Sequence, residues 1–155
     1  MITIRPSLPE DSDDIRRVSE SAIATLRETY RPNQKALANR KRLSTQLSRL
    51  VALVDGKIAG TTQFYVDGEA LRIIGLLVHS DYRRQGVARS LVQGMADIAR
   101  KEGCRFLATR TVKETGNVPV FQRLGFDVLT ERPDEYSESD KYRELTEVDF
   151  QMNIT

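Results

Sequence analysis

The sequence has 155 residues, of which 39% are hydrophobic and 30% charged, and this balance indicates a folded domain and argues against disorder. Its net charge of +2 is too small to indicate a nucleic-acid-binding protein, and no apolar run approaches the ~20 residues that span a bilayer. A single cysteine and a single histidine exclude an internal disulfide and argue against a metal site. The first residues lack the segments of a signal peptide, so we expect a cytoplasmic protein without a nucleic-acid or membrane partner.

The first third of the chain predicts one strand and two helices. Residues 2–4 alternate and predict a short strand. Acidic residues and apolar residues at spacings of three and four predict a helix over about residues 10–29. After a break, a more polar helix is expected over about residues 34–47. Its inward-facing residues would be Leu37, Leu43 and Leu47.

Three strands are expected next, over residues 50–54, 57–66 and 71–78. The pairs Asp55-Gly56 and Asp67-Gly68 separate them, and Asp-Gly is a strong signal for a tight hairpin turn. The sequence therefore predicts an antiparallel meander whose last strand is the most apolar of the three.

A polar loop and a strongly amphipathic helix follow this strand, and the helix begins near residue 87. The start of a helix presents several unpaired backbone N–H groups and a partial positive charge, so it binds anions, most often phosphate. Gly86 has no side chain to keep a ligand from the backbone, and Ala88 is small. The positive side chains around this turn are Arg83, Arg84 and Arg89.

The remainder of the chain predicts three strands and one short helix. The expected elements are a buried strand over residues 104–108, a polar loop over 109–116, a helix over 118–124 ending at Gly125, a strand over 126–130, an acidic loop over 132–143 and a final strand over 148–154. Because the strand at 104 follows a crossover helix, it should lie parallel to the strand at 71–78. The expected fold is a single α/β (α+β) domain with a mixed sheet, in the order β-α-α-β-β-β-α-β-α-β-β over residues 1–155.

The segment Arg83-Arg84-Gln85-Gly86-Val87-Ala88 resembles the pyrophosphate-binding motif Arg/Gln-x-x-Gly-x-Gly/Ala of the GNAT N-acetyltransferase superfamily. Downstream, Asn117 and the segment Phe121-Gln122-Arg123-Leu124-Gly125-Phe126 resemble the Asn…Tyr-x-x-Leu-Gly-Phe segment of that family. The predicted element order is similar over nearly the whole chain. The short motif becomes specific in this context, because a strand precedes it and a helix follows it.

This resemblance implies that the protein binds acetyl-CoA. In the family, backbone groups at the end of the central strand pair with the pantetheine arm, and the following loop wraps the pyrophosphate. The Asn117 side chain would contact the cofactor, cap the next helix, or do both. The cofactor-binding residues that the resemblance implies are Leu76, Leu77, Val78, Arg83, Arg84, Gln85, Gly86, Val87, Ala88, Arg89, Asn117 and Phe121.

The family's reaction, direct attack of an amine while both substrates are bound, needs an oxyanion stabiliser and a proton for the leaving thiolate. The backbone N–H of Val78 is the expected stabiliser. Phe121 stands where the family usually has a tyrosine that protonates the thiolate, so water or another hydroxyl must replace it, or turnover is slow or absent. Glu28, Tyr65 and Glu69 are the candidate acids and bases, acting through water.

The leading hypothesis is therefore an acetyl-CoA-dependent N-acetyltransferase acting on a primary amine of a small molecule or a protein. The alternative is a catalytically weak or inactive module that binds and senses acyl-CoA, and the missing phenol at Phe121 favours it. The resemblance places the loop that carries Asp134, Glu135, Glu138 and Asp140 beside the acceptor site, where these acids would favour a cationic amine. The Tyr30 side chain would lie either in the core or in this pocket. A homodimer is also possible.

Overall fold

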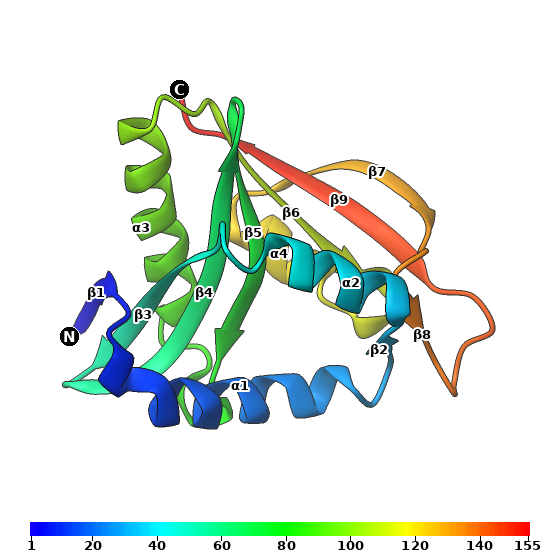
Figure 1. Cartoon of the computed structure of the whole chain (residues 1–155), viewed down its shortest axis with the longest axis horizontal. Coiled ribbons are helices and arrows are strands. Elements are labelled where there is room, and N and C mark those ends of the chain that lie inside the picture. Colours follow the sequence, from blue (N-terminus) through cyan, green and yellow to red (C-terminus); the bar gives the residue numbers. More distant parts are fainter.

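Seven of the nine strands form one mixed sheet, in the order β1-β3-β4-β5-β6-β9-β7, in the computed structural model, which describes residues 1–155 (Figure 1). Its strands are β1 (Ile2–Pro6), β3 (Ser48–Val54), β4 (Lys57–Asp67), β5 (Ala70–Val78), β6 (Phe106–Val112), β7 (Asp127–Pro133) and β9 (Thr146–Asn153). Two short strands, β2 (Arg31–Pro32) and β8 (Ser137–Glu138), pair separately. The helices are α1 (Ser12–Leu26), α2 (Gln34–Leu43), α3 (Val87–Lys101) and α4 (Val118–Leu124), and the 3-10 turns are η1 (Pro9–Asp11), η2 (Ser80–Tyr82) and η3 (Lys113–Thr115). The expected mixed fold is confirmed, with β2 and β8 added to the expected order.

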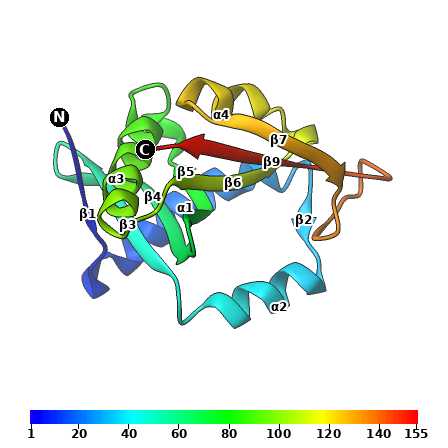
Figure 2. The same cartoon turned by 90° about the horizontal axis from the view of Figure 1, so that it is seen from above.

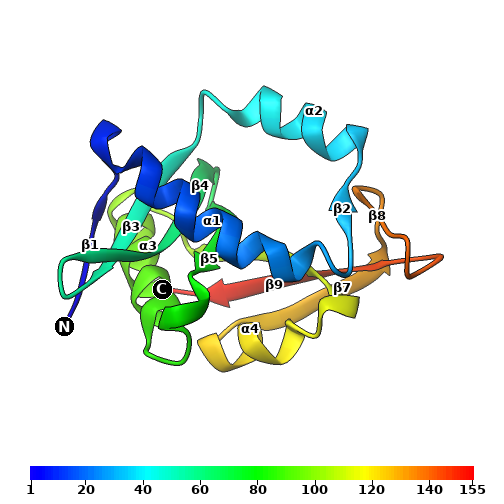
Figure 3. The same ribbon diagram turned by 90° about the horizontal axis from the view of Figure 1, so that it is seen from below.

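Helices cover both faces of the sheet, as Figures 1 and 3 show, with α1 on the side opposite α3. The larger core lies under α3, where Leu91 and Met95 pack with Leu71, Leu107 and Phe150 of the strands. Each fully buried side chain of this kind contributes about 2 kcal/mol to folding, so the apolar stripe of the predicted amphipathic helix is what holds α3 on the sheet. No helix of the structure is both long and apolar enough to cross a membrane.

Both predicted hairpins are confirmed, but the loop of the second consists of Gly68 and Glu69, because Asp67 is the last residue of β4. Lys57 pairs with Val54 across the first turn, and Ala70 pairs with Asp67 across the second. In the first turn both central residues have positive φ, as a type I′ turn requires, because this turn matches the right-handed twist of the strands. The residues of the two turns therefore determine the antiparallel meander of β3, β4 and β5.

The sheet splits between β5 and β6. The predicted parallel pairing is confirmed, but it joins only Ala70–Arg72 to Phe106–Ala108. Between Gln63 and Phe64 of β4 the register shifts, so Ile74 of β5 is an extra, unpaired residue. Such a bulge bends its strand, and in Figure 1 β5 and β6 diverge below their short contact.

The sequence-based prediction of a strand over 104–108 and a polar loop over 109–116 was wrong in its bounds. The strand β6 continues to Val112, because residues 106–112 pair with β9 along their whole length. Thr109, Arg110 and Thr111 look like loop residues in the sequence, yet they stand on a strand edge that borders the split.

The second helix was also predicted incorrectly. It ends at Leu43 instead of residue 47, none of its residues is buried, and the Leu37 side chain, expected to face inward, is 52% exposed. The physical reason is that α2 does not pack on the sheet, and Figure 2 shows it standing to one side. Its N-terminus is held by the antiparallel pairing of β2 with β8, which falls within a predicted break and a predicted loop.

A bidentate ion pair anchors the start of α1. The Asp11 side chain is only 7% exposed and accepts hydrogen bonds from Arg5 Nη1 at 2.7 Å, Arg5 Nη2 at 3.0 Å and the Leu8 N–H at 2.7 Å. The bonds from Arg5 and then from Leu8 lower the pKa of Asp11 from 3.8 to about 2. Because the carboxyl group is a stronger acid in the folded state, its contribution to stability is present above pH 3.8 and is lost as the pH falls through about 2.

We expect Asp11→Asn to make the folding free energy depend less steeply on pH between pH 4 and pH 2. Urea unfolding followed by circular dichroism across this range measures the slope. The control is Asp13→Asn, which alters a carboxylate that is 96% exposed and lies 3.7 Å from Arg16 Nη1. Equal slopes for the wild type and Asp11→Asn would contradict the role of this ion pair.

Candidate functional site

The loop between β5 and α3 presents a row of free backbone N–H groups. Arg84 and Gly86 have left-handed backbones, with φ of 62° and 85°, and Gly86 is the N-cap of α3. None of the N–H groups of residues 83–89 donates a hydrogen bond to an acceptor within the chain. Because α3 is 15 residues long and adds the positive end of its dipole, this turn has the geometry and charge of an anion site.

The positive side chains of the turn are free as well. Arg83 and Arg84 are exposed and form no ion pair, and Arg89 only donates to the carbonyl of Arg123, at 3.2 Å. The Gln85 side chain donates to the Asp81 carbonyl at 3.3 Å and so lies against the loop. Side-chain cations therefore surround the backbone N–H groups without a protein carboxylate to neutralise them.

The end of β5 has a free edge beside this turn. The His79 N–H donates to the Ala59 carbonyl at 2.9 Å, and hydrogen-bonded pairs alternate along an antiparallel ladder, so Leu77 also faces β4. Leu76 and Val78 therefore turn their N–H and C=O groups toward the split. Since β6 leaves β5 after its third residue, no strand pairs with this edge.

A cavity of about 390 Å³ lies at the split. It brings together Leu76, Leu77, Asn117 and Phe121, four of the residues predicted to bind the cofactor. Tyr30 also lines the cavity, so of the two predicted positions for this residue, core or pocket, the pocket is the one observed. Its other lining residues are Ser19, Ile23, Leu26, Arg27, Arg40, Leu47, Arg49, Thr61, Thr62, Gln63, Ile74, Gly75, Thr109, Arg110 and Thr111.

Phe121 is a wall of the cavity and also part of the core. Its ring stacks on Phe150 at 5.1 Å between centroids and meets Phe126 edge-on at 5.9 Å. Asn117 is the N-cap of α4, but its side chain makes no capping hydrogen bond. The Asn117 amide group is therefore free at the cavity.

The three predicted acid and base candidates do not line the cavity. Glu69 lies at the far end of the β4–β5 hairpin, with a carboxylate oxygen 3.7 Å from Arg105. Tyr65 pairs with Arg72 near that same end, away from Val78. Glu28 is exposed after the end of α1. The structure therefore gives none of the three a position from which to act on a substrate in the cavity.

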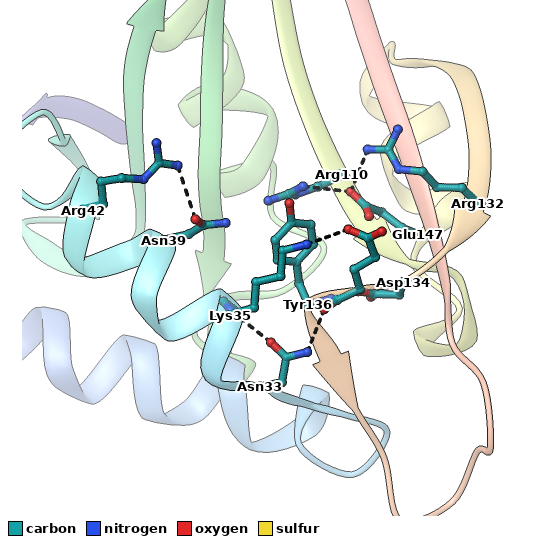
Figure 4. Close-up of polar contacts among 11 residues, drawn as sticks. Asn33, Lys35, Asn39, Arg42, Arg110, Arg132, Asp134, Tyr136 and Glu147 are labelled. Carbon is teal, nitrogen blue, oxygen red and sulfur yellow. Dashed lines mark hydrogen bonds and ion pairs between the residues drawn. The ribbon is translucent and has the colours of Figure 1, made fainter.

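A polar network joins α2 to the segment 134–138 and to β9 (Figure 4). The Asn33 side chain caps α2 and also donates to the Glu135 carbonyl at 2.7 Å, while Lys35 pairs with the Glu135 carboxylate at 2.7 Å. The Glu147 side chain is 4% exposed and pairs with Arg110 at 2.9 Å and with Arg132 at 3.3 Å. The hydrogen bond that Arg132 donates to Glu147 raises the pKa of the Arg132 guanidinium.

The acids of the 134–140 loop are not available as a group. Glu135 pairs with Lys35, and this hydrogen bond lowers the pKa of the Glu135 carboxyl group. Glu138 and Asp140 both pair with Arg31 at 3.1 Å. Asp134 accepts the Tyr136 N–H at 2.7 Å. These contacts hold the loop against the α1–α2 connection, where the sequence had suggested a cationic-amine site.

Sequence reasoning missed the arginines of the cavity, which are Arg27, Arg40, Arg49 and Arg110. They come from the end of α1, from α2, from β3 and from β6. No local pattern marks them, because basic residues at these positions look like ordinary surface charges in the sequence.

The fold is that of a mixed α/β domain whose sheet splits beside a helix start with free N–H groups. The model of the acetyltransferase (GNAT) family matches residues 15–126, which is more than two thirds of the chain. The chain therefore belongs to the GNAT acetyltransferase family, and the resemblance in the turn and in the Leu-Gly-Phe segment is confirmed at the level of the family.

Solved structures share this fold over nearly the whole chain. The ribosomal-protein-S18-alanine N-acetyltransferase of Escherichia coli superposes with a TM-score of 0.76 at 21% identity, covering 100% of this chain and 95% of that one. A GCN5-related N-acetyltransferase of Kribbella flavida gives 0.75 at 20% identity, covering 98% and 97%. The yncA protein of Salmonella typhimurium, solved with its cofactor acetyl-CoA, gives 0.73 at 20% identity, covering 100% and 95%.

Proposed function

We propose that residues 1–155 form one N-acetyltransferase domain, which transfers the acetyl group of acetyl-CoA to a primary amine while both substrates are bound. The observation that carries this proposal is the combination, in a member of the GNAT family, of free N–H groups over residues 83–89 with a free β5 edge at Leu76 and Val78. Both features fit acetyl-CoA, which has an anionic pyrophosphate and an extended amide-bearing arm.

The residues present fit this ligand in three places. Backbone N–H groups of the turn, with Arg83, Arg84 and Arg89 around them, would hold the pyrophosphate. The edge groups of Leu76 and Val78 would pair with the pantetheine amides as an added strand does. The free Asn117 side chain lies on the other wall of the cavity.

When bound, acetyl-CoA supplies an activated thioester. The chain contributes the Val78 N–H, which faces the split and would donate a hydrogen bond to the oxygen that gains negative charge. One such donor accounts for about 100-fold in rate in other acyl-transfer enzymes. Hydroxyl groups of Tyr30, Thr109 and Thr111 line the same cavity and offer routes for protons through water.

The experiment that tests this function measures free thiol release from acetyl-CoA with a wide panel of amines. Calorimetry on the same preparation measures acetyl-CoA binding. Thiol release that depends on an amine supports the transferase. Binding without release from any amine would contradict it and would favour an acyl-CoA sensor, the second candidate, because Phe121 lacks the hydroxyl group that a proton donor needs.

Adding a phenol to the cavity wall should speed turnover. We expect Phe121→Tyr to raise kcat about tenfold, because a positioned proton donor typically contributes about 100-fold or more and this one is not tuned for the site. Steady-state thiol release measures kcat, and the acetyl-CoA affinity should not change.

The control for this variant is Phe106→Tyr, which adds the same hydroxyl group at the start of β6, outside the residues that line the cavity. It should leave kcat at the wild-type value. A Phe121→Tyr rate equal to that of the control would show that the leaving thiolate does not lack a proton donor.

A further inference from the structure

The wall of the cavity is basic and carries no acid. Four of its 20 lining residues are arginines and none is an aspartate or a glutamate. The arginines are Arg27, Arg40, Arg49 and Arg110. A cavity lined by one sign of charge concentrates ligands of the opposite sign, so this wall favours an anionic group.

Three of these four cations have no protein counter-ion. Arg110 is neutralised by Glu147 at 2.9 Å, whereas no carboxylate lies within ion-pair distance of Arg27, Arg40 or Arg49. The Nη1 atom of Arg27 is buried and has no hydrogen-bond partner. A buried, charged donor without a partner is rare in a folded protein, and it is accounted for when a ligand supplies the acceptor.

Arg49 is the best placed of the three. It is half-buried, and its Nη1 atom donates to the Thr61 hydroxyl at 2.8 Å, which orients the guanidinium. Arg49 pairs with Gln63, and Gln63 pairs with Gly75, so Arg49 lies level with the bulge of β5. Burial lowers the pKa of the Arg49 guanidinium from its usual value, as expected for a cation held away from water without a counter-ion.

These arginines are distinct from the anion-binding turn. Val51, two residues beyond Arg49 on β3, packs with Val18 of α1, and side chains two apart share a face of the strand. Arg49 therefore faces the α1 side of the sheet, while α3 packs on the opposite side. An anion at Arg49 and a pyrophosphate at the start of α3 would be separate groups.

The nearby acids do not cancel this charge. A second hollow of about 170 Å³ adjoins the cavity toward α2 and includes Asp134 and Glu147. Glu147 is already held by Arg110 and Arg132, and Asp134 accepts the Tyr136 N–H. The Oε2 atom of Glu147 is also buried without a partner, but it and Asp134 line only this second hollow, so the charged side chains that line the larger cavity are the four arginines.

We infer that the acceptor is an amine that itself carries an oxyanion group, with a carboxylate as in a free amino acid the simplest case. Arg49, with Arg27 and Arg40, would hold the oxyanion, since guanidinium groups bind carboxylates through paired hydrogen bonds. The amino group would then point from Arg49 along β5, toward the free edge at Leu76 and Val78. This inference rests on the proposed function and names its substrate class.

The first experiment compares each amino acid with its own amide in the thiol-release assay, with aminoalkyl phosphonates as a further set of oxyanions. The paired compounds share the same amino group and side chain. An amide makes its amino group a weaker base, so more of it is neutral and the intrinsic bias favours the amide. We expect kcat/KM to be at least about tenfold higher for the acids, and equal or lower values would overturn the inference while leaving the transferase in place.

The second experiment uses Arg49→Gln, with Arg40→Gln as a further variant, because Arg40 is exposed and makes no hydrogen bond that folding requires. We expect KM for the acids to rise about tenfold or more in Arg49→Gln, with KM for amides unchanged. The control is Arg16→Gln, which removes an exposed cation of α1 that pairs with Asp13. Equal losses for acids and amides would overturn the inference.

Calorimetry separates this inference from the proposed function. Amino acids and their amides are titrated into the protein–CoA complex of the wild type and of Arg49→Gln, so binding is read without turnover. If the wild type binds the free amino acids and Arg49→Gln does not, the inference is supported, even when no thiol is released. The missing thiol release would contradict only the transferase. The inference is overturned if the free amino acids do not bind, or if they bind no more tightly than their amides. It is also overturned if Arg49→Gln binds acetyl-CoA more weakly, because the arginines would then hold cofactor phosphates.

Discussion

Gly86→Glu is expected to weaken the binding of acetyl-CoA about 100-fold, since losing charge-assisted hydrogen bonds to an anion costs about 1.5–3 kcal/mol and each 1.4 kcal/mol is a factor of ten. Gly86 is the N-cap of α3 with φ of 85°, a backbone that a residue with a side chain adopts at a cost. The new carboxylate would accept the free N–H groups of the turn and repel the pyrophosphate. Calorimetric titration with acetyl-CoA measures the change.

Gly103→Glu is the matched control. Gly103 has φ of 79°, nothing lies within 4 Å of an added Cβ, and it follows the opposite end of α3. The control therefore adds the same charge and similar backbone strain away from the turn, and its acetyl-CoA affinity should equal that of the wild type. Unchanged affinity in Gly86→Glu would show that the turn is not the pyrophosphate site.

Gly60→Ala is expected to destabilise the fold by about 2 kcal/mol, because overpacking a well-packed core typically costs about 1–3 kcal/mol. A Cβ at Gly60 would lie 2.7 Å from Val87 Cγ1 and 3.1 Å from the Leu77 carbonyl oxygen. Neither neighbour yields easily, since one is backbone and the other is a β-branched side chain on a helix. Val87 is the first residue of α3, so the displaced helix start should also weaken acetyl-CoA binding.

Urea unfolding measures the cost, and a double-mutant cycle with Val87→Ala identifies its origin. Removing the Val87 methyl groups should relieve part of the clash, so the two changes together should cost less than their sum by about 1 kcal/mol. Gly75→Ala is the control on the neighbouring strand, because nothing lies within 4 Å of a Cβ there. Additive costs, or an equal loss in Gly75→Ala, would contradict the close approach of α3 to β4.

The elements predicted correctly from the sequence have causes that lie within a few residues. The two hairpin turns form through positive φ values at Asp55, Gly56 and Gly68. The apolar stripe on residues 87–101 forms α3 because one side of it is buried. The helix over 118–124 ends at Gly125, as expected, with φ of 108°. The family was also predicted correctly, because the turn and the Leu-Gly-Phe segment are local motifs.

The errors occurred where distant segments decide the outcome. Residues 109–112 became a strand because β9, some forty residues later, pairs with them. The α2 helix is unburied because no part of the sheet lies beneath it. The leucines of this helix predicted an inward face and gave no sign of that. The candidates Glu28, Tyr65 and Glu69 were chosen by residue type, and only the split of the sheet shows that none of them reaches the cavity.

The sequence by itself determined that this chain carries an arginine-rich turn between an apolar strand and an amphipathic helix, because adjacent residues create that turn. It also showed that position 121 offers no hydroxyl group. Only the tertiary structure decided which charged side chains line the other side of the cavity. Arg27 follows α1, Arg40 lies on α2 and Arg49 lies on β3. In the sequence they look like separate surface charges, and folding brings them to one wall without a counter-ion. Charge acts through space, so the sign of this site depends on distances that the order of residues along the chain does not contain.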